Sequence, residues 1–135
     1  MAALDSTEAS ALLNAILRQQ ATASTTGINL RLGSTSPSGS SDMTELPNGN
    51  GYVTGGTACT FGAAAIVSGI PTSYNTSVLT WTNTSGGWTI NGIELWDQAG
   101  TPNRWMWGTW IGAPISVANG NSFAVPASGI IATLT

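Results

Sequence analysis

Short apolar segments, each ending at a turn signal, follow one another from residue 28 to the end of the chain. Ile28, Leu30 and Leu32 alternate with polar residues, which is the pattern of a strand with one buried face. Seven more segments of this kind follow, at 52–61, 77–83, 90–97, 104–111, 115–118, 122–125 and 130–134. Asn119-Gly120, between two of them, is a strong hairpin signal. Short strands at this spacing predict a mainly β chain, folded as an antiparallel β-sandwich of jelly-roll-like form.

A helical pattern precedes the strands, over residues 5–20. Asp5 stands where the N-cap of such a helix is expected. The apolar residues form one stripe at helical spacing: Ala9, Leu12, Leu13, Ile16 and Leu17. The chain is therefore expected to consist of one short N-terminal α-helix with a connector (1–27) and a single β-sandwich domain (28–135) that carries a long loop at 33–51.

The apolar stripe of this helix has two possible partners, because a lone short helix must pack its apolar face against another surface. The helix packs either on the chain's own sandwich or against a neighbouring subunit of a larger assembly. In the second case Leu12, Leu13 and Ile16 are interface residues.

Only nine of the 135 residues are charged, and the chain has no His. All three cations are arginines, so there is no lysine for a Schiff base or a phosphate loop, and no Ser-His-Asp or Cys-His pair. The single cysteine, Cys59, makes neither an internal disulfide nor a zinc site. Three cations cannot neutralise a run of phosphates, so we expect no nucleic-acid partner.

The six carboxylates do not group into a catalytic or metal-binding set. Glu94 and Asp97 fall on opposite faces of a regular strand, whereas a glycosidase needs two carboxylates that face each other. Asp42 and Glu45 alone are too few for a calcium site. We therefore expect a protein that is not an enzyme and that holds no cofactor and no metal.

The polar surface consists mainly of neutral side chains, since Ser and Thr make up 34 of the 135 residues. Such a surface has few charges that keep copies apart, which suits a subunit of an assembly; the alternative is simply a Thr-rich β protein. The chain has no run of 18 apolar residues and opens with no basic and apolar leader. We therefore expect no membrane partner and synthesis in a cytoplasm.

All six tryptophans fall between residues 81 and 110. Trp105 and Trp107 are expected to share one face of their strand, with Trp110 on the other. Indole rings fill cores and subunit interfaces, whereas rings exposed in a row stack on sugars. Tryptophan on both faces of one strand favours core and interface, so Trp105, Trp107 and Trp110 are further candidate interface residues. A carbohydrate-binding module is the alternative.

Several segments occur in a recognisable order along the chain. A short helix at 11–18 is followed by an alternating strand at 28–32, which leads into a Gly/Ser-rich loop. Gly-Asn-Gly-Tyr at 49–52 and Thr-Phe-Gly-Ala-Ala at 60–64 come next. At 88–97 a Trp precedes an apolar strand that ends in Asp. In these segments and their order, the chain resembles a family of small structural proteins of tailed bacteriophages, described as head-decoration, tail-fibre-like or minor tail proteins.

The resemblance implies a virion component that is built on a β-sandwich, assembles as a homotrimer and brings no catalytic residues. On this basis we expect a capsid decoration or cement protein, made in the bacterial host cytoplasm, that binds the major capsid protein and stabilises the head shell. A minor tail or tail-fibre-like protein, with tail proteins as partners, is the alternative within the family. A host-surface carbohydrate-binding module is the alternative outside it.

Overall fold

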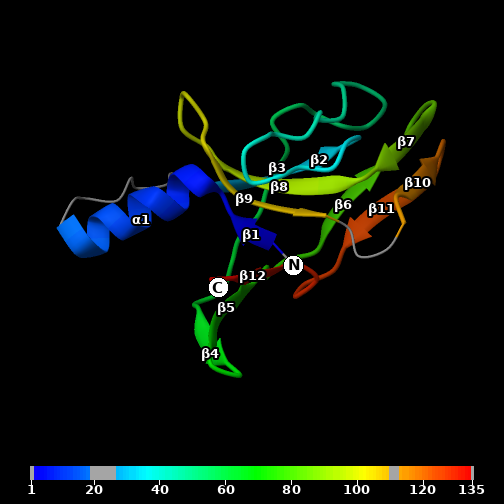
Figure 1. Ribbon diagram of the computed structural model, residues 1–135. Helices are drawn as coiled ribbons and strands as arrows, with labels where there is room; N and C mark the ends of the chain where they lie inside the picture. The colour runs from blue at the N-terminus through cyan, green and yellow to red at the C-terminus, as the bar shows by residue number, and fades with distance from the viewer. Residues whose placement is uncertain (1, 19–26, 110–112, 135) are drawn as a thin grey trace.

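The computed structural model describes residues 2–18, 27–109 and 113–134, and these residues are mainly β (Figure 1). The elements are β1 (Ala2–Leu4), α1 (Ser6–Arg18), β2 (Ile28–Gly33), β3 (Thr57–Ala58), β4 (Ala65–Val67), β5 (Ile70–Tyr74), β6 (Leu79–Thr82), β7 (Gly87–Ile90), β8 (Gly92–Asp97), β9 (Arg104–Thr109), β10 (Ile115–Ala118), β11 (Ser122–Val125) and β12 (Ile131–Thr133). The predicted mainly β character and the antiparallel pairing are confirmed, while the jelly-roll-like sandwich stays a prediction.

The helix α1 begins directly after Asp5 and projects away from the strands (Figure 1). The N–H of Ala9 donates to the carbonyl of Asp5 at 2.8 Å, so Asp5 holds the N-cap position that the sequence indicates. Contacts between α1 and the strands are marginal. Leu13 is 58% exposed and Leu17 76% exposed, so at least this part of the apolar stripe is open to solvent.

The largest sheet has eight strands in the order β3-β2-β8-β9-β1-β12-β5-β4. Its neighbours are antiparallel apart from β1 and β12, which run parallel. β1 was not predicted from the sequence, because three residues, Ala2-Ala3-Leu4, are too few to show alternation. This short strand lies between β9 and β12 and so joins the central strands to an arm made of β12, β5 and β4.

The remaining strands form a two-stranded ribbon with a bend in the middle. β6 pairs with β11, and β7 pairs with β10. The hairpin predicted at Asn119-Gly120 is therefore wrong: β10 and β11 follow each other along one side of the ribbon. The bend is held by Asn83, which is fully buried and whose amide donates to the carbonyl of Val117 at 2.8 Å. The N–H of Asn121 still donates to the carbonyl of Ala118 at 3.0 Å, so Asn119-Gly120 forms a tight turn, but this turn lies at the bend of the ribbon and not in a hairpin.

The core lies between the β2–β8 part of the large sheet and the ribbon. The rings of Trp81 on β6 and Phe123 on β11 stack with centroids 5.9 Å apart, and Tyr52 meets Trp88 edge to face. The buried hydrophobic cluster consists of Leu30, Leu32, Leu46, Tyr52, Cys59, Leu79, Trp81, Trp88, Ile90, Ile93, Leu95, Val117, Phe123, Val125 and Ile130. Burial raises the pKa of the Cys59 thiol to about 11, so Cys59 is an inert core residue.

The predicted loop at 33–51 is free of helix and strand after Gly33, and most of its residues are exposed, but a few of them anchor it to the core. Met43 and Leu46 are buried, and so is Tyr52 directly after the loop. The Tyr52 hydroxyl accepts from the N–H of Leu32 at 3.1 Å and donates to the Glu45 carboxylate at 2.7 Å. The loop is therefore bonded to the edge of β2.

Candidate interaction surface

A buried ion cluster fixes the position of the N-terminal segment. Arg104, the first residue of β9, is 6% exposed. Its guanidinium donates twice to Asp5, at 2.6 and 2.9 Å, and once to Glu94, at 2.9 Å. The remaining N–H groups donate to the carbonyls of Ser41 and Gly39, at 2.8 and 3.2 Å. All five donors of the guanidinium are therefore used.

The cluster holds together the N-terminal segment, the loop at 33–51, β8 and β9. Burial alone would lower the pKa of Arg104, but the bonds to Glu94 and Asp5 outweigh it and raise that pKa. Glu94 also accepts from the backbone N–H of Met43 and from the indole N–H of Trp96, both at 2.8 Å. Glu94 is thus a paired structural carboxylate, which ties the loop and β8 to β9.

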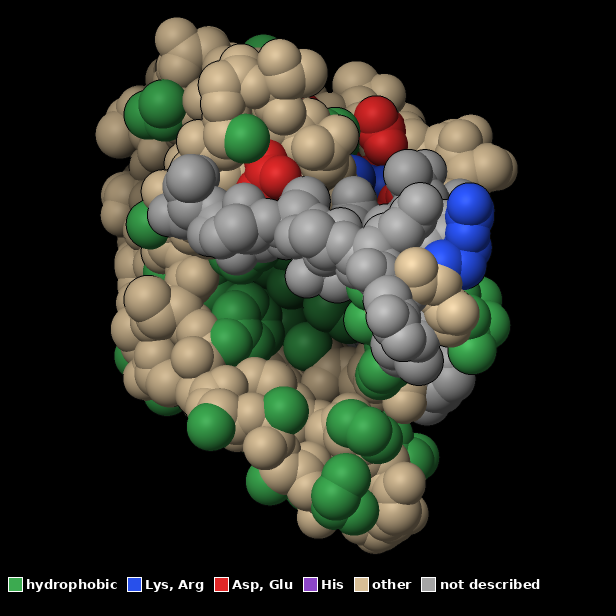
Figure 2. All heavy atoms as spheres, turned by 90° about the vertical axis from the view of Figure 1, so that its left-hand side faces the viewer, with side chains coloured by type: hydrophobic (Ala, Val, Ile, Leu, Met, Phe, Trp, Pro, Cys, Tyr) green, Lys and Arg blue, Asp and Glu red, His purple; other side chains and the backbone are tan. Residues whose placement is uncertain are grey.

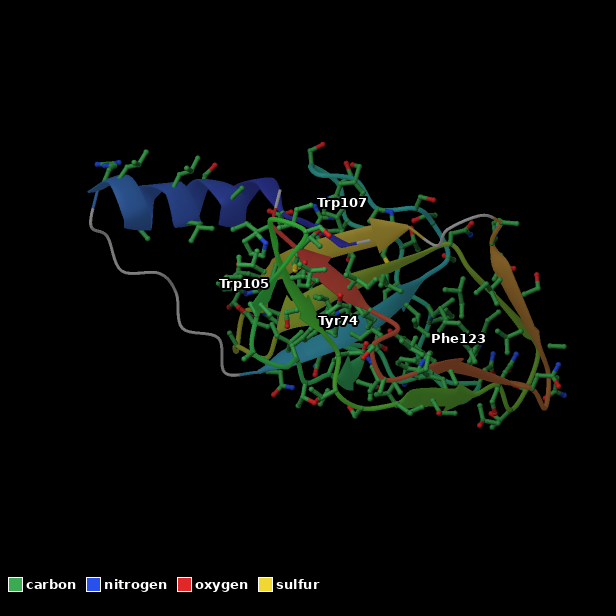
Figure 3. The ribbon with its side chains drawn as sticks, turned by 90° about the horizontal axis from the view of Figure 1, so that it is seen from below. Tyr74, Trp105, Trp107 and Phe123 are labelled. Atoms are coloured by element: carbon green, nitrogen blue, oxygen red, sulfur yellow. The ribbon has the colours of Figure 1, made fainter. Side chains whose placement is uncertain are left out.

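A bulge in β9 sends its tryptophans to different faces. Glu94 pairs with Trp107 and Leu95 with Met106, but Trp96 pairs with Arg104, so Trp105 is an extra residue in β9. Trp107 lies opposite Glu94, on the face that carries the ion cluster. Trp105 lies on the face of Met106 and Leu95 instead. The two labelled rings, Trp105 and Trp107, lie apart in Figure 3. The expectation that Trp105 and Trp107 share a face is therefore wrong, because it assumed an unbroken strand.

Trp105 lines an apolar groove of about 350 Å³. The groove lies between the central strands and the arm, and the hollow lined by hydrophobic side chains is visible in Figure 2. Its lining residues are Ile28, Phe61, Ser73, Leu95, Trp105, Met106 and Ala132. None of them carries a charge, so the groove suits an apolar side chain or a small apolar group.

The apolar face continues from the groove along the arm. Ala132 of β12 pairs with Ser73 of β5, and both line the groove. Side chains two residues apart share a face, so Pro71 lies on the same face as Ser73. Pro71 pairs with Ile66 of β4, which is 70% exposed. An uncharged and mostly apolar face therefore runs from Trp105 through the groove to Ile66.

The interface residues predicted from the sequence lie in different surroundings. Leu12 is half-buried and Leu13 exposed, and Ile16 lies in α1 with its side chain outside the described residues. Trp105 and Trp107 are both half-buried, and Trp110 lies outside the described residues. The assignment of these six residues to an interface stays a prediction.

Sequence reasoning missed the hairpin of β4 and β5, which carries much of the apolar face. Its turn is Ser68-Gly69, and both residues have positive φ angles, of 50° and 83°. The Ser-Gly dipeptide between Ala65–Val67 and Ile70–Tyr74 is the signal that marks this turn. The Pro in the second run conceals its strand character, because proline is typical of edge strands and loops.

Asp97 organises the turn that leads into β9. Although its burial acts to raise the pKa of Asp97, hydrogen bonds from Asn103, Trp105 and Ala99 lower it below the usual range. The N–H of Asn103 donates at 2.9 Å and the indole of Trp105 at 3.2 Å. The charged carboxylate thus sets the orientation of Trp105 in the groove.

Replacing Asp97 with Asn is expected to weaken the fold at neutral pH and to reduce its acid sensitivity. Because the folded pKa is depressed, the stabilisation by Asp97 is complete above about pH 4 and is lost as the pH falls through the folded value. Urea unfolding at neutral and acid pH, at one protein concentration, measures both effects. Parallel pH curves for the wild type and Asp97→Asn would contradict this role.

No helix among the described residues is long and apolar enough to span a membrane. The described part of the chain also contains no group of three or more His, Cys, Asp or Glu side chains that would hold a metal ion.

The family model described as "Podophage GP4 fiber I protein gp80" matches residues 3–133, which is almost the whole chain. No individually curated protein matches the sequence.

Proposed function

The chain belongs to the podophage fiber I protein family, and from this membership we propose that it is a subunit of a fibre on the tail of a phage particle. The match over residues 3–133 carries the proposal, because it includes both α1 and the strands up to β12. That the chain is a phage virion structural protein agrees with the resemblance seen in the sequence. The family description names a fibre, so it supports the tail-fibre alternative more than the expected capsid decoration.

The proposed role is mechanical and non-enzymatic. The most buried carboxylate of the described residues, Glu94, is engaged with Arg104, and Cys59 is a protonated core thiol. The surface instead exposes apolar side chains on α1 and on the face from Trp105 to Ile66. Obligate subunit interfaces are of this apolar kind, which supports assembly into a homotrimer that binds tail proteins.

The carbohydrate-binding alternative receives little support from the described tryptophans. Trp81 and Trp88 are buried in the core. Trp96 is half-buried beneath the guanidinium of Arg31, which lies 4.1 Å from its ring centroid. Trp105 and Trp107 are half-buried on opposite faces of β9. A sugar-stacking platform needs exposed rings in a row, and these five rings do not form one.

The number of copies per virion tests the placement on the tail. Quantitative mass spectrometry of purified particles, with the major capsid protein as internal reference, is expected to give at most a few tens of copies. Hundreds of copies, on the scale of the capsid protein, would place the protein on the head and overturn the fibre assignment.

The oligomeric state is a second expected outcome. Native mass spectrometry of the full chain at micromolar concentration is expected to show a trimer, because exposed apolar faces associate when water can be excluded from them. A clean monomer would contradict assembly through these faces.

A further inference from the structure

We propose that the β4–β5 hairpin of one copy packs its apolar face into the groove beside Trp105 of a second copy. This inference rests on the proposed function as a homotrimeric fibre subunit and names the surfaces that make the contact. It is carried by the exposure of the hairpin, by the position of the groove and by the distribution of charge.

The hairpin is an apolar element that its own chain leaves uncovered. Every residue from Gly62 to Pro71 is exposed. Ile66 is 70% exposed on one face, while Val67 and Ile70 are 42% and 38% exposed on the other. β4 is also an edge strand at the end of the eight-stranded sheet. An uncharged, apolar edge of this kind promotes aggregation unless a partner covers it.

The groove lies at the base of the hairpin, on the same face of the sheet. Ser73 and Ala132 belong to the groove, and Ile66 lies farther out on the arm, beyond Pro71. Because the hairpin and the groove share one sheet, the hairpin cannot fold back into the groove of its own copy. Its protruding face and the hollow beside it (Figure 2) are therefore available to separate copies.

The absence of charge on both surfaces favours a second copy as the partner. The sequence contains no charged residue from Leu46 to Ile93 and none from Trp105 to the C-terminus. The hairpin comes entirely from these uncharged stretches. The groove residues also come from them, apart from Ile28 and Leu95, which are apolar. Such surfaces do not repel each other, and they offer nothing to phosphates or lipid headgroups. An exposed apolar edge must be covered at all times. A second copy meets this requirement, because it is present at equal concentration from synthesis onward.

The geometry of the contact determines the symmetry of the assembly. A hairpin that enters a groove joins two different surfaces, so it is a heterologous contact, which closes into a ring when the rotation permits. Pairing of β4 with β4 of a second copy would instead be isologous and give a two-fold dimer. A trimer therefore requires the hairpin-to-groove contact or another heterologous one.

Ile66→Asp tests the contact at its outer end. This substitution places a charge on a side chain that is already exposed, so the monomer is expected to fold normally and the trimer to dissociate at micromolar concentration. Val78→Asp is the matched control, because Val78 is 61% exposed but lies outside the hairpin and the groove. Native mass spectrometry gives the oligomeric state, and circular dichroism confirms folding.

Disulfide trapping tests the pairing of surfaces. The variant with both Ile66→Cys and Ala132→Cys is expected to form covalent oligomers on oxidation, while each single variant does not. The native Cys59 does not interfere, because it is buried and protonated. Non-reducing gel electrophoresis shows the covalent species.

Three outcomes would overturn the proposal. Covalent dimers of Ile66→Cys alone would show β4 edge pairing instead. A trimer that survives Ile66→Asp but not Leu13→Asp would place α1 in the contact. A monomeric wild type would remove the contact altogether. None of these outcomes changes the copy number per virion, so a failure of this inference is distinguishable from a failure of the fibre assignment.

Discussion

Replacing Arg104 with Met is expected to lower the free energy of unfolding by about 3–5 kcal/mol, because it leaves two buried carboxylates without their cation. Asp5 is 7% exposed and Glu94 2% exposed, so water cannot replace the lost bonds without opening the structure. Thermal or urea unfolding at one protomer concentration measures the loss. For a chain of this size it corresponds to a decrease in Tm of roughly 10–20 °C.

Arg18→Met is the matched control for this substitution. It removes the same charge and the same number of side-chain atoms, but Arg18 is exposed at the end of α1. A change within about 0.5 kcal/mol is expected there, as for most surface substitutions. If Arg104→Met also changed stability by this little, the cluster would not be what holds the N-terminal segment.

Hydrogen exchange gives this prediction a local readout. The N–H of Asp5 donates to the carbonyl of Trp105 at 2.8 Å, and the N–H of Met43 donates to Glu94 at 2.8 Å. Both amides are expected to lose protection in Arg104→Met, because β1 and the loop depend on the same cation. Amides of the β6–β11 ribbon, whose strands contribute no bonding partner to Arg104, are expected to keep theirs.

The strands could be located from the sequence, but their pairing could not. Alternation along Ile28–Gly33 and Gly92–Asp97 predicts two strands, and these pair with each other over six positions. In contrast, β10 and β11 lie on either side of a strong hairpin signal and yet pair with β7 and β6. Turn propensity involves only two residues, whereas the burial of Val117 and Phe123 involves contacts with the whole core. The burial therefore determines which strands pair.

The candidate site was less predictable because its contacts are nonlocal. Asp5 and Arg104 are 99 positions apart, and neither residue has a neighbour in the sequence that indicates the pair. The bulge at Trp105 is likewise marked by no glycine or proline at the bulged position, although the indole of Trp105 donates to Asp97 there. A periodic pattern assigns faces only as long as the strand stays regular.

Replacing Trp81 with Ala is expected to lower the free energy of unfolding by about 3–5 kcal/mol, the usual loss for a large buried ring. Trp81 is 5% exposed and stacks on Phe123, and its indole N–H donates to the Thr57 hydroxyl at 3.1 Å. The ring therefore connects the ribbon to β3 at the edge of the large sheet. Urea unfolding followed by circular dichroism measures the change without depending on tryptophan fluorescence.

Two further variants separate the parts of this effect. Trp81→Phe keeps an aromatic ring against Phe123 but removes the bond to Thr57, so an intermediate loss of about 1–2 kcal/mol is expected. Thr80→Ala, on the exposed face of the same strand, is expected to change stability by no more than about 0.5 kcal/mol. Equal losses for Trp81→Ala and Thr80→Ala would show that Trp81 does not hold the ribbon to the large sheet. In that case other contacts would have to hold the ribbon to the large sheet, and the central place of Trp81 in the core would be contradicted.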